Sequence, residues 1–269
     1  MKRLGIVLVG VCAMAVCSEA AMIPLSYNTP YVQTFNTGTP INGPGLANSG
    51  TSSVPPNGWA FAESGTGANT TYTAAAGMGS APAADTYSYG GGMSADRSFG
   101  TYAGSSANFS SMIGANFMNS SGSPITRITI GYIGEEWRLG ANNRADRLDF
   151  QYSLNASSLT DSSATWIDVN NLDFVTPWTK GNPGGTDGNQ GKYQTAVGGS
   201  VSFLNIPSGA GFWIRWTDLN VSGPDDGLAV DNFAIVAVPE ASTVFAGLAL
   251  LGCFVCGVVR RCQAFQPTA

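Results

Sequence analysis

Residues 125–133 read ITRITIGYI, and this stretch decides the fold class of the chain. Ile128, Ile130 and Tyr132 stand at every second position, so they share one face of an extended strand while their neighbours share the other. This period of two is typical of a half-buried β-strand, whereas an amphipathic helix has a period near 3.6 residues. The stretch therefore predicts a strand with one face in a hydrophobic core.

The same alternation recurs along the chain and predicts more strands. Downstream it covers residues 147–153, 201–203, 212–216 and 233–235, with turn-forming segments between them. Upstream, shorter strands are expected at residues 31–35, 59–61, 97–102 and 111–117. A series of roughly eight to eleven short strands without helices between them predicts an all-β fold, an antiparallel β-sandwich of jelly-roll type. Two smaller domains divided near residues 122–124 are the alternative.

Composition excludes several classes of function. The chain has 12 Lys and Arg, 17 Asp and Glu, and no His, so Ser-His-Asp and Cys-His catalysis and His-ligated metal centres are excluded. Residues 22–237 hold eight Lys and Arg against fifteen Asp and Glu, a net charge of −7, which argues against nucleic acid as a partner. All five cysteines lie outside this segment, so the body is expected to fold without disulfides.

Both ends of the chain carry targeting patterns. Lys2 and Arg3 precede an uncharged stretch, and small residues at 18 and 20 follow it, which predicts a secretory signal peptide over residues 1–20. Residues 21–237 are then an exported extracellular domain. At the other end a membrane helix is expected over residues 241–259, because its 19 residues rise about 28 Å, close to the hydrocarbon thickness of a bilayer. Arg260 and Arg261 should hold its end, and the short tail 263–269, on the cytoplasmic side.

Residues 238–262 resemble the PEP-CTERM sorting signal of exopolysaccharide-producing bacteria. The resemblance rests on the box Val238-Pro239-Glu240, the apolar helix, and the pair Arg260-Arg261, in that order. It implies an exosortase as partner, a membrane-embedded protease that removes the helix and releases the body to the cell surface or extracellular matrix. Ala241 stands where that family usually has a second proline, and eight residues follow Arg261. A permanent single-span membrane anchor is the alternative.

The densest acidic cluster of the body precedes the last expected strand. Asp225, Asp226, Asp231 and Asn232 supply oxygen atoms of the kind that calcium binds, and they are the candidate ligands of a structural calcium ion, the one possible cofactor. The alternative is a solvated turn followed by a strand in which Asp231 pairs with an arginine such as Arg215.

Two further groups of residues suggest sugar chemistry. Glu135 and Glu136 lie beside a tryptophan, but neighbours in a strand point to opposite faces, so a catalytic pair would need a distant partner such as Asp149 or Asp218. An ion pair with Arg138 or Arg215 is the alternative role. Trp137 and Trp213 are the candidate sugar contacts, with Trp59, Trp166 and Trp178 also available for stacking, although core filling is the commoner fate of tryptophan in a sandwich.

Residues 126–235 also resemble an uncharacterised extracellular β module of exported bacterial proteins. The likeness is carried by EEWR at 135–138, LDFQYS at 148–153, DGN at 187–189, WIRWTD at 213–218 and DGLAVDNF at 226–233. It implies no known activity. The leading interpretation is a non-enzymatic surface or exopolysaccharide-matrix protein sorted by an exosortase. The alternatives are a carbohydrate-binding module for matrix polysaccharide and a glycoside hydrolase or lyase that works through carboxylates alone.

Overall fold

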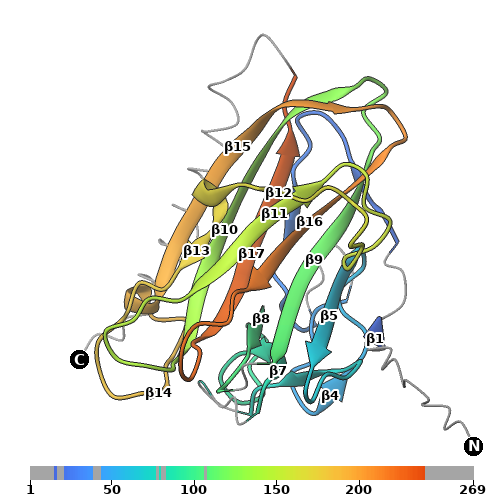
Figure 1. The fold of residues 1–269 in the computed structure, drawn as a ribbon. Helices are drawn as coiled ribbons and strands as arrows, with labels where there is room; N and C mark the ends of the chain where they lie inside the picture. The colour runs from blue at the N-terminus through green and yellow to red at the C-terminus, as the bar shows by residue number, and fades with distance from the viewer. Residues whose placement is uncertain are drawn as a thin grey trace, which may run out of the picture.

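The computed structural model describes residues 15–16, 21–38, 44–76, 79, 83–105 and 108–239. These residues form two β-sheets packed face to face, with two single-turn 3-10 helices, η1 (Asn170–Leu172) and η2 (Gly191–Tyr193) (Figure 1). The all-β sandwich expected from the alternating pattern is therefore confirmed. In the part of the chain that the structure describes, no helix is long and apolar enough to cross a membrane.

Sheet 1 has eight strands. Its order is β1 (Ala15–Val16), β5 (Trp59–Gly65), β9 (Phe109–Asn119), β16 (Gly211–Asp218), β11 (Arg147–Ser153) and β12 (Ile167–Asp168), with β13 (Phe174–Val175) beside β11 and β2 (Ile23–Leu25) beside β9. Of the predicted signal peptide 1–20, only the two residues of β1 are described, and they pair antiparallel with β5.

Sheet 2 has nine strands. Its order is β14 (Gly184–Gly185), β10 (Ile125–Leu139), β17 (Gly227–Ala237), β8 (Ser98–Tyr102), β7 (Asp85–Tyr89), β6 (Tyr72–Ala74) and β4 (Thr51–Ser52), with β15 (Gln194–Ile206) beside β10 and β3 (Tyr31–Gln33) beside β17. Pairing is antiparallel except for β2 with β9 and β6 with β7. Strands from before and after residues 122–124 pair in both sheets, as β9 does with β16 and β3 with β17.

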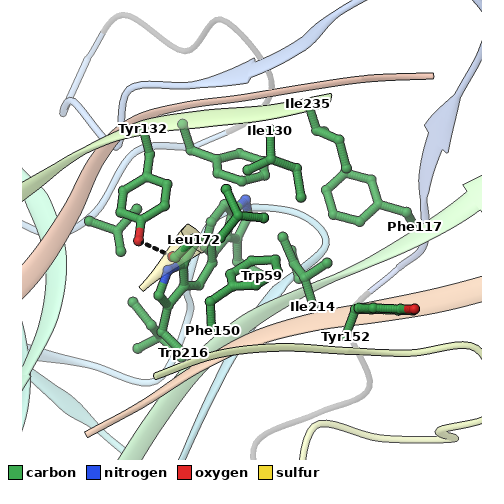
Figure 2. Packing of buried hydrophobic residues seen from close by; sticks show 14 of the residues in the cluster. Trp59, Phe117, Ile130, Tyr132, Phe150, Tyr152, Leu172, Ile214, Trp216 and Ile235 are labelled. Atoms are coloured by element: carbon green, nitrogen blue, oxygen red, sulfur yellow. Dashed lines mark hydrogen bonds between the residues drawn. The ribbon is translucent and has the colours of Figure 1, made fainter. Parts of the chain in front are cut away.

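The core lies between the sheets, as the alternation predicts. Ile128, Ile130 and Tyr132 of β10 are at most 3% exposed and face the inner side of sheet 1. There Trp216 meets Tyr132 edge-on, at 5.3 Å between ring centroids, and stacks on Trp59 at 6.0 Å. Figure 2 shows these rings together, with the Tyr132 hydroxyl donating a hydrogen bond to the Leu172 carbonyl at 2.6 Å. Burial of such large apolar rings is the main force that holds the sheets together.

A bulge in β17 changes which residues face the core. Between Gly131 and Ile133 the partner strand advances by three residues, from Ala234 to Asp231, and Asn232 has a left-handed backbone with φ of 49°. An extra residue in one strand reverses the alternation beyond it. Leu228 and Val230 face inward before the bulge, whereas Phe233 and Ile235 do so after it,. Asp231 therefore points to the outer face of sheet 2.

Candidate functional site

One end of the sandwich gathers four aspartates from two connections between strands. Asp225 and Asp226 stand before β17, Asp218 ends β16, and Asp146 precedes β11. The backbone amide of Asp226 donates to Oδ2 of Asp146 at 2.9 Å, and Oδ1 of Asp226 accepts from the amide of Gly140 at 2.6 Å. All four side chains are at most 2% exposed. We call these four residues the aspartate cluster.

The aspartate cluster has less positive charge than its carboxylates require. Arg144 is its one salt-bridge partner among the described residues, at 3.3 Å from Asp226 and 3.6 Å from Asp146. Buried oxygens of Asp218, Asp225 and Asp226 have no hydrogen-bond partner within the described part of the chain. Burial first, and then the neighbouring Asp146, raises the pKa of Asp225 to about 7. Burial followed by repulsion from Asp146 and Asp225 raises the pKa of Asp218 well above its usual value.

The four predicted calcium ligands do not converge. Asp225 and Asp226 belong to the aspartate cluster, but Asp231 lies on the outer face of sheet 2, where Asn232 donates to its Oδ2 at 2.7 Å. Asp226 and Asp231 are an odd number of residues apart, and the strand between them keeps its alternation, so they point to opposite faces. Among the residues described, no three acidic side chains are grouped as the ligands of a metal ion. Calcium binding stays a prediction, and Asp231 and Asn232 are not part of one site with Asp225.

Asp231 instead faces another carboxylate. Glu135 of β10 lies on the same outer face, 1% exposed, and accepts from Nε1 of Trp137 at 2.9 Å and from Nε2 of Gln194 at 2.9 Å. Burial raises the pKa of Glu135 to about 7, and burial together with the nearby Glu135 raises the pKa of Asp231 well above its usual value. The ion pair of Asp231 with Arg215 is wrong, because Arg215 lies on the outer face of sheet 1, with its guanidinium 3.7 Å from the ring centre of Trp166.

Glu135 and Glu136 lie on opposite faces of β10, as expected. Glu136 shares the inner side with Tyr132 and is fully buried. Burial and then the charges of Asp226 and Asp146 raise the pKa of Glu136 to about 8. Neither glutamate forms a salt bridge in the described part of the chain, so the expected pairing with Arg138 or Arg215 is wrong.

The two predicted sugar-contact tryptophans are both buried. Trp137 is 1% exposed and stacks on Tyr89 at 5.7 Å, with Gly188 pressed against its indole. Trp213 is 4% exposed and packs on Leu159 of the connection between β11 and β12. Both rings point outward from their sheets, as the alternation predicts, but loops cover them. Neither presents a ring face to a sugar, so this prediction is wrong.

A different tryptophan reaches the surface. Trp178 and Tyr193 are half-buried and meet edge-on at 5.9 Å between ring centroids. The ammonium group of the exposed Lys192 stands 5.2 Å from the Trp178 ring centre and 4.6 Å from that of Tyr193. We call Trp178, Lys192 and Tyr193 the aromatic site. It combines partly exposed rings with a hydrogen-bond donor, the two features that hold a sugar ring.

The aromatic site and the aspartate cluster are joined through Glu136. The backbone amide of Trp178 donates to Oε2 of Glu136 at 3.1 Å, while Oε1 of Glu136 has no partner among the described residues. The hydroxyl of Thr186, which directly follows β14, donates to the backbone carbonyl of Glu136 at 2.6 Å. The candidate functional site is therefore this end of the sandwich, with aromatic side chains outside and carboxylates beneath them.

Sequence reasoning found only part of this site. Trp178 was one of five tryptophans considered for stacking, and nothing local separates it from the others. Lys192 and Tyr193 were missed, since a Lys-Tyr pair in a polar loop carries no signal of its own. Asp146 was missed because it stands 80 residues from its hydrogen-bond partner Asp226. Asp225 and Asp226 were expected as calcium ligands, and Asp218 was considered only as a distant partner for Glu135 or Glu136.

The structure describes just the start of the predicted sorting signal. Val238 continues from β17, and its amide donates to the carbonyl of Arg127 at 3.0 Å. Pro239 is half-buried. Glu240, Arg260, Arg261, the expected helix 241–259 and the tail 263–269 lie outside the described residues.

Comparisons with known proteins give no family. No family model matches the chain. No curated protein matches it either.

Three binding or adhesin domains are among the solved structures whose backbone is similar to that of this chain. The CBM22-1 xylan-binding domain of Paenibacillus barcinonensis Xyn10C is 11% identical, with a TM-score of 0.39 over 80% of this chain and 99% of that one. The K1 cleaved adhesin domain of Lys-gingipain from Porphyromonas gingivalis W83 is 12% identical, with a TM-score of 0.34 over 79% and 100%. The family 11 carbohydrate-binding module of Clostridium thermocellum is 10% identical, with a TM-score of 0.29 over 54% and 79%. Likenesses this distant carry no argument about the function of this chain.

Proposed function

We propose that the body is a non-enzymatic polysaccharide-binding domain of an exported surface protein, and that the aromatic site holds the sugar. The observation that carries the proposal is the half-buried pair Trp178 and Tyr193 with Lys192 beside both rings. A pyranose ring stacks through its C–H groups on an exposed indole face, and a neighbouring ammonium donates to its hydroxyls. Trp137 and Trp213, the sugar contacts expected from the sequence, are buried and have no such exposure.

The choice of binding over catalysis rests on where the carboxyl groups lie. Two acids that cleave a glycosidic bond must flank it from the two sides of an open site. Glu135 and Glu136 are both buried and point to opposite faces of β10. Asp149, the other partner considered, lies on sheet 1 beside Arg147 at 3.3 Å. These three acids do not face one another across an open site, which supports a binding role over the hydrolase or lyase alternative.

Export and sorting belong to the same proposal. The body is held outside the cytoplasm by the helix 241–259, and an exosortase then releases it to the cell surface or the extracellular matrix. The support is the ordered box, apolar run and Arg260-Arg261 pair of the sequence. The jelly-roll type is likewise proposed, and its support is a chain that crosses between the sheets at each step from β8 through β9, β10 and β11 and again from β15 through β16 to β17.

Binding is tested with a glycan array of neutral and acidic oligosaccharides on the purified full chain, with and without calcium. Trp178→Ala should weaken binding to any captured glycan at least about tenfold, the equivalent of about 1.4 kcal/mol. Trp166→Ala is the matched control, because Trp166 is also partly buried but is packed against Arg215 on the other sheet. Absence of binding at millimolar sugar, or equal binding by the Trp178 variant, rejects the sugar site.

Sorting is tested separately in cells. Replacement of Pro239 and Glu240 by alanine should leave a longer, membrane-bound species in cell fractions. Identical fractionation and migration of the variant and the unaltered protein would reject exosortase processing and favour the permanent anchor.

A further inference from the structure

The edge strands of the two sheets differ greatly in length. Among the described strands with a single partner strand, seven are only two or three residues long: β1, β2, β3, β4, β12, β13 and β14. The eighth, β15, has 13 residues and pairs on one side only, with β10. Short edges give another chain little to pair with, whereas a long edge presents a row of free backbone groups. β15 is therefore the one long open edge of the described sheets.

β15 also lacks the side chains that usually protect an edge. Its sequence, QTAVGGSVSFLNI, contains no charged residue and no proline. Thr195, Val197 and Gly199 face inward yet remain half-buried, unlike Ile128 and Ile130 of the neighbouring strand, as expected where nothing continues the sheet. On the outer face Ala196 and Gly198 are exposed and small. Neither charge nor large side chains at these positions of β15 would obstruct the approach of another strand.

A strained aromatic residue stands at one end of the regular part of this edge. Opposite β10 the pairing shifts between Ser202 and Ile206, which marks a bulge, and within it Phe203 has φ of 62°. Its side chain is 100% exposed. A left-handed backbone costs a residue such as phenylalanine about 1–2 kcal/mol, and an exposed ring gains nothing from burial. Strain of this kind persists where other contacts compensate for it, and no described residue covers this ring.

We propose that β15 is the interface through which two copies of this chain associate, by antiparallel pairing of β15 with β15. The argument for a second copy is electrostatic and geometric. The body carries a net charge of −7, so two copies repel each other except through neutral surface, and the uncharged edge from residue 194 to 206 offers that surface. Antiparallel pairing of identical strands is a two-fold contact, which closes on itself as a dimer.

The register of the dimer follows from the regular stretch, residues 194–202. Its central residue is Gly198, which pairs with itself across the two-fold axis. Phe203, immediately after the stretch, then falls beside Tyr193 of the second copy, immediately before it. An aromatic contact would close each end of the paired strands, and the two nine-stranded sheets would continue into one another.

The first experiment measures mass by analytical ultracentrifugation of the full chain over a range of concentrations. The unaltered protein should be a dimer at high concentration, and Ala196→Lys with Gly198→Lys should raise the dimer dissociation constant at least about tenfold. The control, Thr66→Lys with Thr70→Lys, adds the same charge at exposed residues between β5 and β6 and should leave the dimer intact. A monomeric unaltered protein overturns the proposal. So does a dimer that survives the edge lysines, which would show association through another surface, the apolar C-terminal run included.

A second variant separates the interface from the stability of the fold. Phe203→Asn replaces a strained ring with a residue that tolerates the left-handed backbone. It should weaken the dimer at least about tenfold while leaving the melting temperature of the dilute monomer unchanged or higher. An unchanged dimer dissociation constant would show that Phe203 does not belong to the interface. A Gly198→Cys chain should also form an intermolecular disulfide under oxidation beyond the level of the unaltered chain and of Ser208→Cys, and failure to do so overturns the two-fold register.

Discussion

The backbone amide of Trp178 donates a hydrogen bond to Oε2 of Glu136, at 3.1 Å. This contact ties the exposed part of the candidate site to a fully buried residue of a central strand. The position of the indole therefore depends on a carboxyl group whose pKa is raised to about 8 by burial and by the nearby Asp226 and Asp146. Substitution of the buried acids should therefore change the position of Trp178 through this hydrogen bond.

Glu136→Gln and Glu136→Leu should separate hydrogen bonding from charge. Glutamine keeps an acceptor for the Trp178 amide and carries no charge, so glycan affinity should be retained. Leucine leaves the amide without its acceptor, at a cost of about 1 kcal/mol or more, and should weaken glycan binding. Calorimetric titration with a glycan captured by the array measures both. Equal affinity of the two variants would show that the bond does not position Trp178.

Stability should fall as the pH rises from about 4 to 8. Burial is the main cause that raises the pKa of Glu63 and Asp225 to about 7, of Asp226 to about 6 and of Glu136 to about 8. Acids with raised pKa values keep their protons in the folded state at a pH where the unfolded chain has lost them. The free energy of unfolding is therefore highest below the unfolded-state values and decreases through this window. Urea unfolding at pH 5, 7 and 8.5 checks the sign, and an increase with pH would contradict it.

Asp218→Asn should stabilise the protein at high pH. Asp218 is 2% exposed, accepts from the Thr101 hydroxyl at 2.9 Å, and has a second oxygen without a partner in the described residues. Asparagine keeps the acceptor and has no acidic proton to lose, so it avoids the repulsion from Asp146, Asp225 and Asp226 that Asp218 meets when it ionises. The expected gain is about 1 kcal/mol at pH 8.5, disappearing at low pH where the acids are protonated. A loss of stability at both pH values would show that the charge is compensated by a group of opposite sign.

Calcium should raise the melting temperature if it neutralises the aspartate cluster. With a dissociation constant of about 0.1–1 mM, 10 mM calcium would add about 1.4–2.7 kcal/mol. For a domain of this size that is a rise of about 3–10 °C. Asp226→Asn should reduce the rise, and Asp231→Asn, on the opposite face of sheet 2, should not. The same melting temperature in chelator and in calcium would mean that no ion binds there.

The sequence by itself determined the fold class and much of the core. Ile128, Ile130, Tyr132, Phe150, Ile214 and Trp216 were predicted inward by their spacing, and all lie between the sheets. The reason is local: successive side chains of a strand point to opposite faces, so apolar residues at every second position reveal the buried face. The same rule placed Glu135 and Glu136 on opposite sides of β10.

Only the tertiary structure decided which side chains meet and which remain exposed. Asp146 joins Asp226 because the chain returns after 80 residues, and Asp231 leaves them because it falls on the other face of the same strand, just before the bulge at Asn232. Trp137 and Trp213 point outward as their strands require, but loops folded over each sheet bury them, while Trp178 stays at the surface. Alternation is a property of neighbouring residues, whereas contact between loops and exposure depend on pairing and packing across the whole chain, which no local pattern contains.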